Sequence, residues 1–146
     1  MKIRYGFVSN SSSSSFVVIG TQKPQKLQVE HPQHFILGDL GVTKFEWKPE
    51  TITDVYSRLN FAFLQASYAL AEGIVEPIQL FEQALRDMTN IIHGSFEEPE
   101  DEFAPTPSID HQSRYPENMK MFNTLKSLKH FLFSPDSVIC VDNDNH

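Results

Sequence analysis

The sequence contains a single cysteine, Cys140, among its 146 residues. One cysteine excludes an intrachain disulfide framework, so export to an oxidising compartment would gain nothing, and we expect a cytoplasmic protein. Cys140 lies in an apolar run and is expected to be a buried, inert thiol. A dyad of Cys140 with a histidine stays open, because spacing along the chain does not test it.

Long apolar runs are also absent. No stretch approaches the roughly 20 apolar residues that a membrane-spanning helix needs. Lys2 and Arg4 near the N-terminus are followed only by short apolar runs that serines interrupt, which is not the pattern of a signal peptide. The sequence therefore predicts a soluble protein without a membrane partner.

Basic residues are scarce, with 12 Lys and Arg against 19 Asp and Glu and a net charge of −7. Residues 1–26 carry four bases and no acid, whereas residues 27–115 carry fifteen acids and five bases. A protein that binds nucleic-acid phosphates needs a basic face, so direct nucleic-acid binding is disfavoured. The basic N-terminal segment leaves room for a small anion site.

Apolar periodicity predicts one α+β domain over residues 1–146, in which a small mixed sheet packs against three helices in the order βββαααβ. The predicted strands cover residues 16–19, 34–37, 42–47 and 137–141, and the predicted helices cover 49–73, 77–94 and 116–132. The second and third strands are expected to form a hairpin. Residues 95–115 are acidic and proline-rich, which predicts a mobile loop.

The side chains expected in the core are two phenylalanines near the N-terminus and the apolar positions of the three predicted helices. They include Phe7, Phe16, Leu59, Phe63, Leu70, Phe81, Leu85, Ile92, Met119, Phe122 and Leu125. The helix positions recur at three- and four-residue steps, as an amphipathic helix requires.

The most distinctive segment is a run of five serines between two aromatic anchors, Phe7 and Phe16. Three interpretations stay open: a flexible linker, an ordered strand or turn whose hydroxyls satisfy backbone groups, and an anion or partner site with a basic residue nearby. The candidate binding residues are Arg4, Ser9, Asn10, Ser11, Ser12, Ser13, Ser14 and Ser15. The run is not a phosphate-binding P-loop, because it lacks the glycines and lysine and leads into a strand.

The N-terminal stretch Gly6 to Phe16 reads GFVSNSSSSSF. It resembles the start of a group of small, mostly uncharacterised bacteriophage and bacterial proteins, and the match covers about a tenth of the chain. The segment from Phe131 to Ser137 and the Asp-Asn-Asp-Asn ending are similar to the tails of some of these proteins. The resemblance implies a phage-type setting, in the host cytoplasm, and implies no activity.

Asp142, Asp144 and His146 alternate after the last predicted strand, so all three could face one side and offer ligands to a metal ion. The alternative is a solvated acidic tail. The six histidines lack the spacing of a zinc site, and no Gly-x-Ser-x-Gly nucleophile motif occurs. We find no catalytic constellation and expect no cofactor.

Three functions follow from these patterns. The leading one is a non-enzymatic, phage-type accessory protein that acts through contact with a host or phage protein. The second is a small nucleotide- or phosphate-binding protein or enzyme that uses the serine run, with Asp142 and Asp144 holding a metal. The third is an acidic mimic of nucleic acid that inhibits a host enzyme.

Overall fold

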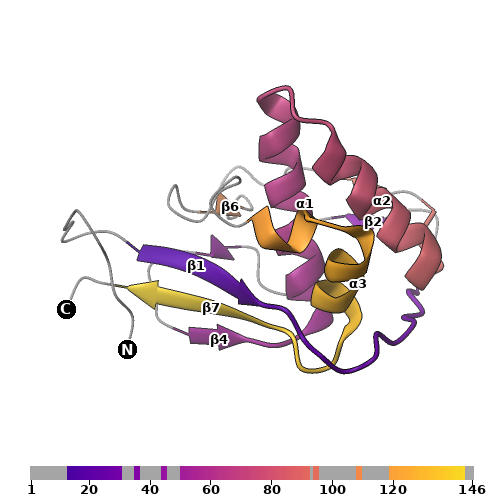
Figure 1. The fold of residues 1–146 in the computed structure, drawn as a ribbon, viewed down its shortest axis with the longest axis horizontal. Coiled ribbons are helices and arrows are strands. Elements are labelled where there is room, and N and C mark those ends of the chain that lie inside the picture. The colour runs from indigo at the N-terminus through magenta and orange to yellow at the C-terminus, as the bar shows by residue number, and fades with distance from the viewer. Residues whose placement is uncertain are drawn as a thin grey trace.

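A computed structural model describes residues 13–30, 35–36, 44–45, 50–92, 94–95, 108–109 and 119–143 (Figure 1). The strands are β1 (Ser13–Val18), β2 (Phe35–Ile36), β3 (Lys44–Phe45), β4 (Glu50–Ile52), β5 (Gly94–Ser95), β6 (Ser108–Ile109) and β7 (Val138–Asn143). The helices are α1 (Val55–Ala71), α2 (Glu76–Met88), the 3-10 helix η2 (Met119–Phe122) and α3 (Leu125–Phe133). These elements confirm the predicted α+β class.

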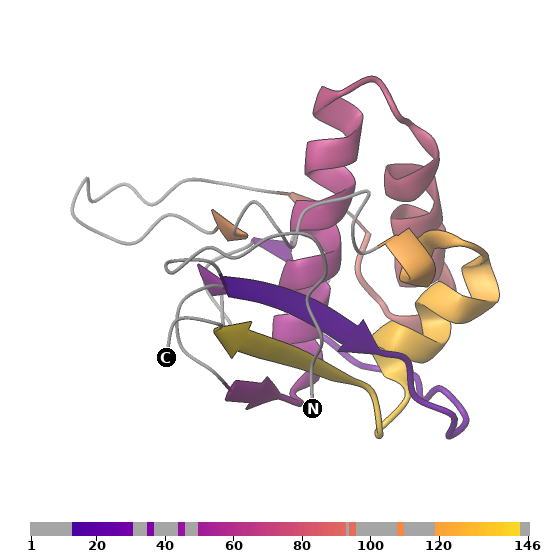
Figure 2. The same ribbon diagram turned by 60° about the vertical axis from the view of Figure 1, so that its left-hand side comes forward.

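Strands β1, β7 and β4 form a three-stranded antiparallel sheet in that order. The last strand of the chain therefore lies between the first strand and β4, as Figure 2 shows. This sheet has three strands rather than the predicted four or so, and it is antiparallel rather than mixed. Parallel pairing occurs instead in two short ladders, β2 with β5 and β3 with β6.

One face of this sheet supplies the core. Ile52, Ile139 and Val141 are buried there at 5% exposure or less and pack with the helices. Because side chains alternate along a strand, their neighbours Thr51 and Cys140 point to the opposite face. The helices lie on the buried side of the sheet (Figure 1).

Helix α1 begins later than predicted. Glu50–Ile52 forms strand β4 against β7, and the helix starts at Val55. Asp54 caps it, since its carboxylate accepts hydrogen bonds from the Ser57 backbone N–H at 2.9 Å and from the Ser57 hydroxyl at 2.7 Å. Residues 50–52 form a strand because they pair with β7, which is distant in the chain. The spacing of the apolar side chains, which is helical, does not predict this pairing.

Helices α1 and α2 pack side by side in opposite directions, as predicted (Figure 1). The chain turns between them at Gly73, whose φ of 86° lies in the left-handed region that glycine tolerates. The Phe63 and Phe81 rings meet edge to face with centroids 5.5 Å apart. Phe81 is fully buried, so the interpretation of this segment as a helix pair is confirmed.

The predicted third helix is divided into η2 and α3, with residues 116–118 outside the described residues. Thr124 and Ser127 form a capping box at the start of α3: each side chain accepts a hydrogen bond from the other residue's backbone N–H. Phe131 of α3 packs edge to face on Phe61 of α1, with centroids 6.4 Å apart.

The predicted hairpin between residues 34–37 and 42–47 is wrong among the described residues. β2 pairs with β5 and β3 pairs with β6, each partner following α2 in the chain. A local turn signal suggested the hairpin, whereas contacts between distant segments determine the pairing. β6 lies within the predicted loop 95–115, and residues 96–107 and 110–115 of that loop lie outside the described residues.

The predicted core is right at its centre and wrong at its margins. Leu59, Phe81, Leu85 and Phe122 are buried, and Phe63 and Leu125 are partly buried against them. Four predicted core residues are exposed instead: Phe16 at 40%, Leu70 at 47%, Ile92 at 73% and Met119 at 43%. Leu70, Ile92 and Met119 lie at or beyond helix ends, where a periodic pattern continues after the packing partner has ended.

Candidate functional site

The serine run is in part a strand. Ser13–Val18 forms β1, so the last three serines of the run are paired with β7. Ser15 is only 2% exposed, and it faces the same side of the sheet as the partly buried Val17. Strand formation begins three residues earlier than predicted and favours the structural interpretation for this end of the run.

Five predicted residues of the serine site lie outside the described residues: Arg4, Ser9, Asn10, Ser11 and Ser12. Phe7, the predicted anchor before the run, also lies outside them. The anion or partner site at these residues therefore stays a prediction.

Of the candidate metal residues, Asp142 lies at the same end of the β1–β7 strand pair as the serine run. Asp142 belongs to β7 and is directly opposite Ser14 of β1 in the antiparallel register. Asp144 and His146 lie outside the described residues. Within the part of the chain that the structure describes, no group of three or more His, Cys, Asp or Glu side chains is arranged to hold a metal ion. The sheet nevertheless pairs Ser13–Ser15 of the serine run with Val141–Asn143.

We call the side of the sheet that faces away from the helices the outer face, and the side chains described on it are mostly apolar. Its described side chains are Phe16, Val18, Thr51, Val138 and Cys140. Phe16 is 40% exposed and Val18 is 47% exposed, and Phe16 is the register partner of Cys140. None of these side chains carries a formal charge, so this face offers water little to bind.

Cys140 is half-buried rather than buried, because it lies on the outer face. Partial burial disfavours its ionised form and raises the pKa of the thiol above its ordinary value. A nucleophilic cysteine needs the opposite shift. The position of Cys140 thus agrees with an unreactive thiol.

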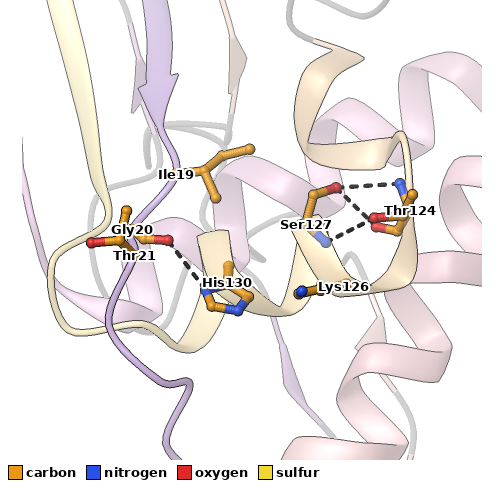
Figure 3. A pocket seen from close by; sticks show the side chains of 7 residues that line it. All are labelled: Ile19, Gly20, Thr21, Thr124, Lys126, Ser127 and His130. Atoms are coloured by element: carbon orange, nitrogen blue, oxygen red, sulfur yellow. Dashed lines mark hydrogen bonds between the residues drawn. The ribbon is translucent and has the colours of Figure 1, made fainter.

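A second surface feature is a groove between the end of β1 and helix α3 (Figure 3). It has a volume of about 380 Å³ and is wide open to solvent. Its walls are residues 19–21 on one side and Thr124, Lys126, Ser127 and His130 on the other. The Ile19 side chain points from the strand toward α3. Nothing in the sequence pattern singles out this groove, because its two walls are about a hundred residues apart.

Hydrogen bonds fix both walls of the groove relative to each other. The Nδ1 atom of His130 lies 3.2 Å from the Gly20 carbonyl oxygen. The Gly20 N–H donates to the Ser137 hydroxyl at 2.7 Å, and that hydroxyl donates to the His130 carbonyl oxygen at 2.6 Å. The groove is therefore preformed in the free chain.

Asp136 ties down the segment that follows β1. Its carboxylate accepts hydrogen bonds from the backbone N–H groups of Thr21 and Gln22, both at 3.1 Å, and from the hydroxyls of Thr21 and Ser134. These bonds stabilise the ionised form and hold the pKa of Asp136 well below its usual range, with the Ser134 hydroxyl contributing most. Asp136 is thus a structural carboxylate.

The buried cation Arg58 connects three segments under the sheet. It is 3% exposed, and its guanidinium donates to the carbonyl oxygens of Leu132, Ser137 and Thr53. Burial lowers the pKa of Arg58, while Asp54 and Asp136 act in the opposite direction. All the acceptors are backbone carbonyls, which indicates a structural role. The apolar spacing of α1 gives no sign of it.

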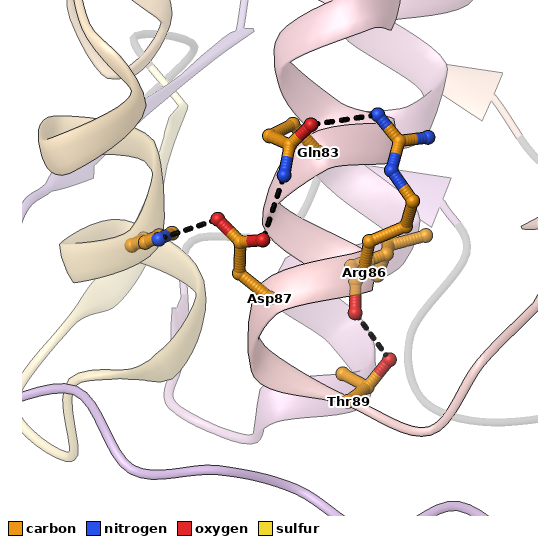
Figure 4. Close-up of polar contacts among 6 residues, drawn as sticks. Gln83, Arg86, Asp87 and Thr89 are labelled. Atoms are coloured by element: carbon orange, nitrogen blue, oxygen red, sulfur yellow. Dashed lines mark hydrogen bonds and ion pairs between the residues drawn. The ribbon is translucent and has the colours of Figure 1, made fainter.

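A polar cluster joins α2 to α3 on the surface (Figure 4). Asp87 accepts from Lys129 at 2.7 Å and from Gln83 at 2.6 Å, and Arg86 donates to Gln83 at 2.8 Å. The hydrogen bond from Lys129 is the main reason that the pKa of Asp87 is lowered. Because Asp87 and Gln83 both bond to neighbouring side chains on these helices, the cluster serves as a surface brace.

Comparison with known proteins adds no identity. A scan against protein-family models found no match to the chain, and searches of curated proteins and of solved structures found no match either. In the described part of the chain, no helix has both the length and the apolar character needed to span a membrane.

Proposed function

We propose that this chain is a non-enzymatic binding protein that acts by contacting another protein through its outer face. The exposed Phe16 side chain supports this proposal most directly. Phe16 leaves 40% of its surface open to water, and Val18, on the same face of the strand, leaves 47%. Contact with an apolar patch on a partner would remove both side chains from water. This burial would stabilise the complex by about 25 cal/mol per Å² of apolar area.

The outer face has further properties of a contact surface. It belongs to a sheet whose other side is anchored in the core by Ile139 and Val141, so the backbone beneath it is rigid. A rigid surface loses little conformational freedom on binding. We place this function in the host cytoplasm and in a phage-type setting, as the resemblance of the N-terminal segment implies.

The test is affinity capture from a lysate of the native host with the wild type and two charge variants. Phe16→Lys introduces a charge on the outer face, whereas Ile92→Lys introduces the same charge at an apolar residue that is 73% exposed elsewhere. We expect a protein that the wild type and Ile92→Lys retain and Phe16→Lys loses. The captured protein is then purified and its affinity for all three chains measured. Equal affinity for all three would contradict the proposal.

The two other functions predict different outcomes. A nucleotide or phosphate binder should be stabilised in a thermal-shift assay by inorganic phosphate or by ATP with Mg²⁺. Because Asp142 is the register partner of Ser14, the strand pairing brings the backbone of an acidic residue beside the serine run. A nucleic-acid mimic should instead co-purify with a host nucleic-acid enzyme in a salt-sensitive manner.

A further inference from the structure

The groove between β1 and α3 combines a preformed shape with a local reversal of charge. Its strand wall belongs to residues 13–29 and its helix wall to residues 119–135. These two segments contain five lysines and no acidic residue, in a chain whose net charge is −7, and each is followed directly by one acid, Glu30 or Asp136. The fold thus places the two acid-free segments against each other, and the groove runs between them.

The lysines of these segments are mostly available to a ligand. Four are exposed: Lys23, Lys26, Lys120 and Lys126. The fifth, Lys129, is paired with Asp87. Asp136, which directly follows the second segment, is held by the backbone at Thr21 and Gln22. Of the charged side chains, Lys126 is the one that lines the groove.

The lining also limits what the groove can hold. Its surface is mostly apolar, with Ile19 reaching across from the strand. Thr124 and Ser127 already bond each other's backbone N–H groups, so the start of α3 is capped by its own side chains. Nucleic acid is disfavoured, because a long polyanion would meet the acidic remainder of the chain. A short segment with an apolar side chain and a carboxylate fits both properties.

The groove lies on the helix side of β1, around the end of that strand from the outer face. Val18 is exposed on that face, and Ile19, the next residue, lines the groove. A protein seated on Phe16 and Val18 could therefore reach the groove around the end of β1 without leaving the surface.

The geometry points to the groove as the docking site for an acidic, extended segment of the partner protein, with an apolar side chain on Ile19 and a carboxylate at Lys126. This inference rests on the proposed function, since it takes the partner to be a protein. The groove supplies electrostatic selection, whereas the outer face supplies apolar contact.

The test uses a display library of random linear peptides, selected on the purified full-length chain and counter-selected on Lys126→Glu. Glutamate in the first turn of α3 is favoured by the helix dipole, so this variant is expected to fold. Enriched peptides should share Asp or Glu next to an apolar residue. A labelled synthetic peptide of the enriched sequence should bind Lys126→Glu about ten-fold more weakly than the wild type in fluorescence anisotropy. It should also shift the amide resonances of Gly20 and Thr21.

Lys120→Glu is the matched control, because Lys120 is an exposed lysine of the same acid-free segment that does not line the groove. If both variants weaken peptide binding equally, the effect comes from the overall charge of the chain and not from the groove. That result would overturn the inference. It is also overturned if no peptide is enriched, if enriched peptides lack acidic residues, or if a single-stranded oligonucleotide binds more tightly than the peptide.

The outcomes separate this inference from the proposed function. If Phe16→Lys abolishes capture of the partner while Lys126→Glu leaves its affinity unchanged, the proposed function stands and the groove inference fails. If the acidic peptide binds at the groove but Phe16→Lys leaves partner affinity unchanged, the outer face fails as the contact surface.

Discussion

The Arg58 guanidinium donates two hydrogen bonds to the Leu132 carbonyl oxygen, from Nε at 3.2 Å and from Nη2 at 3.0 Å. A third bond, from Nη1, reaches the Ser137 carbonyl oxygen at 3.1 Å. One side chain of α1 therefore satisfies backbone acceptors at the end of α3 and just before β7. Only a planar group with several donors can serve these acceptors together.

Replacing Arg58 with methionine should destabilise the protein by about 3 kcal/mol or more. Methionine fills a similar volume but leaves the buried carbonyl groups of Leu132 and Ser137 without donors, and each such loss costs about 1–3 kcal/mol. Urea unfolding followed by circular dichroism measures the change. Arg86→Met is the control, because Arg86 is exposed and its loss should change the free energy by no more than about 0.5 kcal/mol. Similar values for both variants would contradict this role of Arg58.

Phe81→Ala should cost about 3–5 kcal/mol of stability. Phe81 is fully buried and its ring packs on Phe63, so alanine leaves a cavity between α1 and α2. The same urea titration measures it, with Ile92→Ala as the control at an exposed apolar position. A small loss for Phe81→Ala would mean that the two helices do not depend on this contact.

The sequence predicts those elements whose signals are local. The helix pair is identified by the amphipathic spacing of Phe81 and Leu85 and by Gly73, where the first helix stops. Phe81 and Leu85 are both buried, as expected. Strand β7 is also predicted, because its apolar run is short and follows a turn. Its extension to Asn143 is not, since pairing with β1 lengthens it.

The sequence does not predict features that depend on contacts between distant segments. Residues 50–52 have helical apolar spacing but become a strand because β7 lies beside them. Phe16 is predicted to be buried, yet the register puts it on the outer face, one residue out of phase with Val17. The groove needs His130 of α3 next to Gly20, a neighbourhood that only the folded chain creates.

Asp136 should make stability depend on pH in the acidic range. Its pKa in the folded chain lies below the unfolded value of about 3.9, so its contribution is present above about pH 4 and is lost as the pH falls further. The melting temperature of the wild type should therefore drop below about pH 4 more steeply than that of Asp136→Asn. Parallel pH profiles for the two chains would show that Asp136 does not anchor Thr21 and Gln22.

Gly20→Ala should destabilise the same region by about 1–3 kcal/mol. A Cβ atom at residue 20 would overlap the Asp136 Oδ1 atom and the Ser134 hydroxyl oxygen, so one wall of the groove must move. Thermal unfolding measures the loss. Gly73→Ala is the control: its backbone is strained by a positive φ, but the added Cβ atom meets no atom within 4 Å. Comparison of the two variants separates a steric effect from a conformational one.

Replacing all five serines, from Ser11 to Ser15, with alanine should lower stability, and the single change Ser15→Ala should reproduce most of the loss. Ser15 is 2% exposed on the core side of β1, and a buried hydroxyl that is hydrogen-bonded contributes about 1 kcal/mol. Thermal and urea unfolding of both variants, with Ser11→Ala as a further control, measure how the loss is distributed.

The binding measurements then decide what the other serines do. If the five-alanine chain loses stability but binds the captured partner as tightly as Ser15→Ala does, the run acts as the end of a strand. Unchanged stability with loss of partner or phosphate binding would assign the run to a site. A chain unaffected in both respects would make the run a linker. We expect the first outcome, because β1 continues through Ser13 and keeps its pairing with β7 up to Asn143.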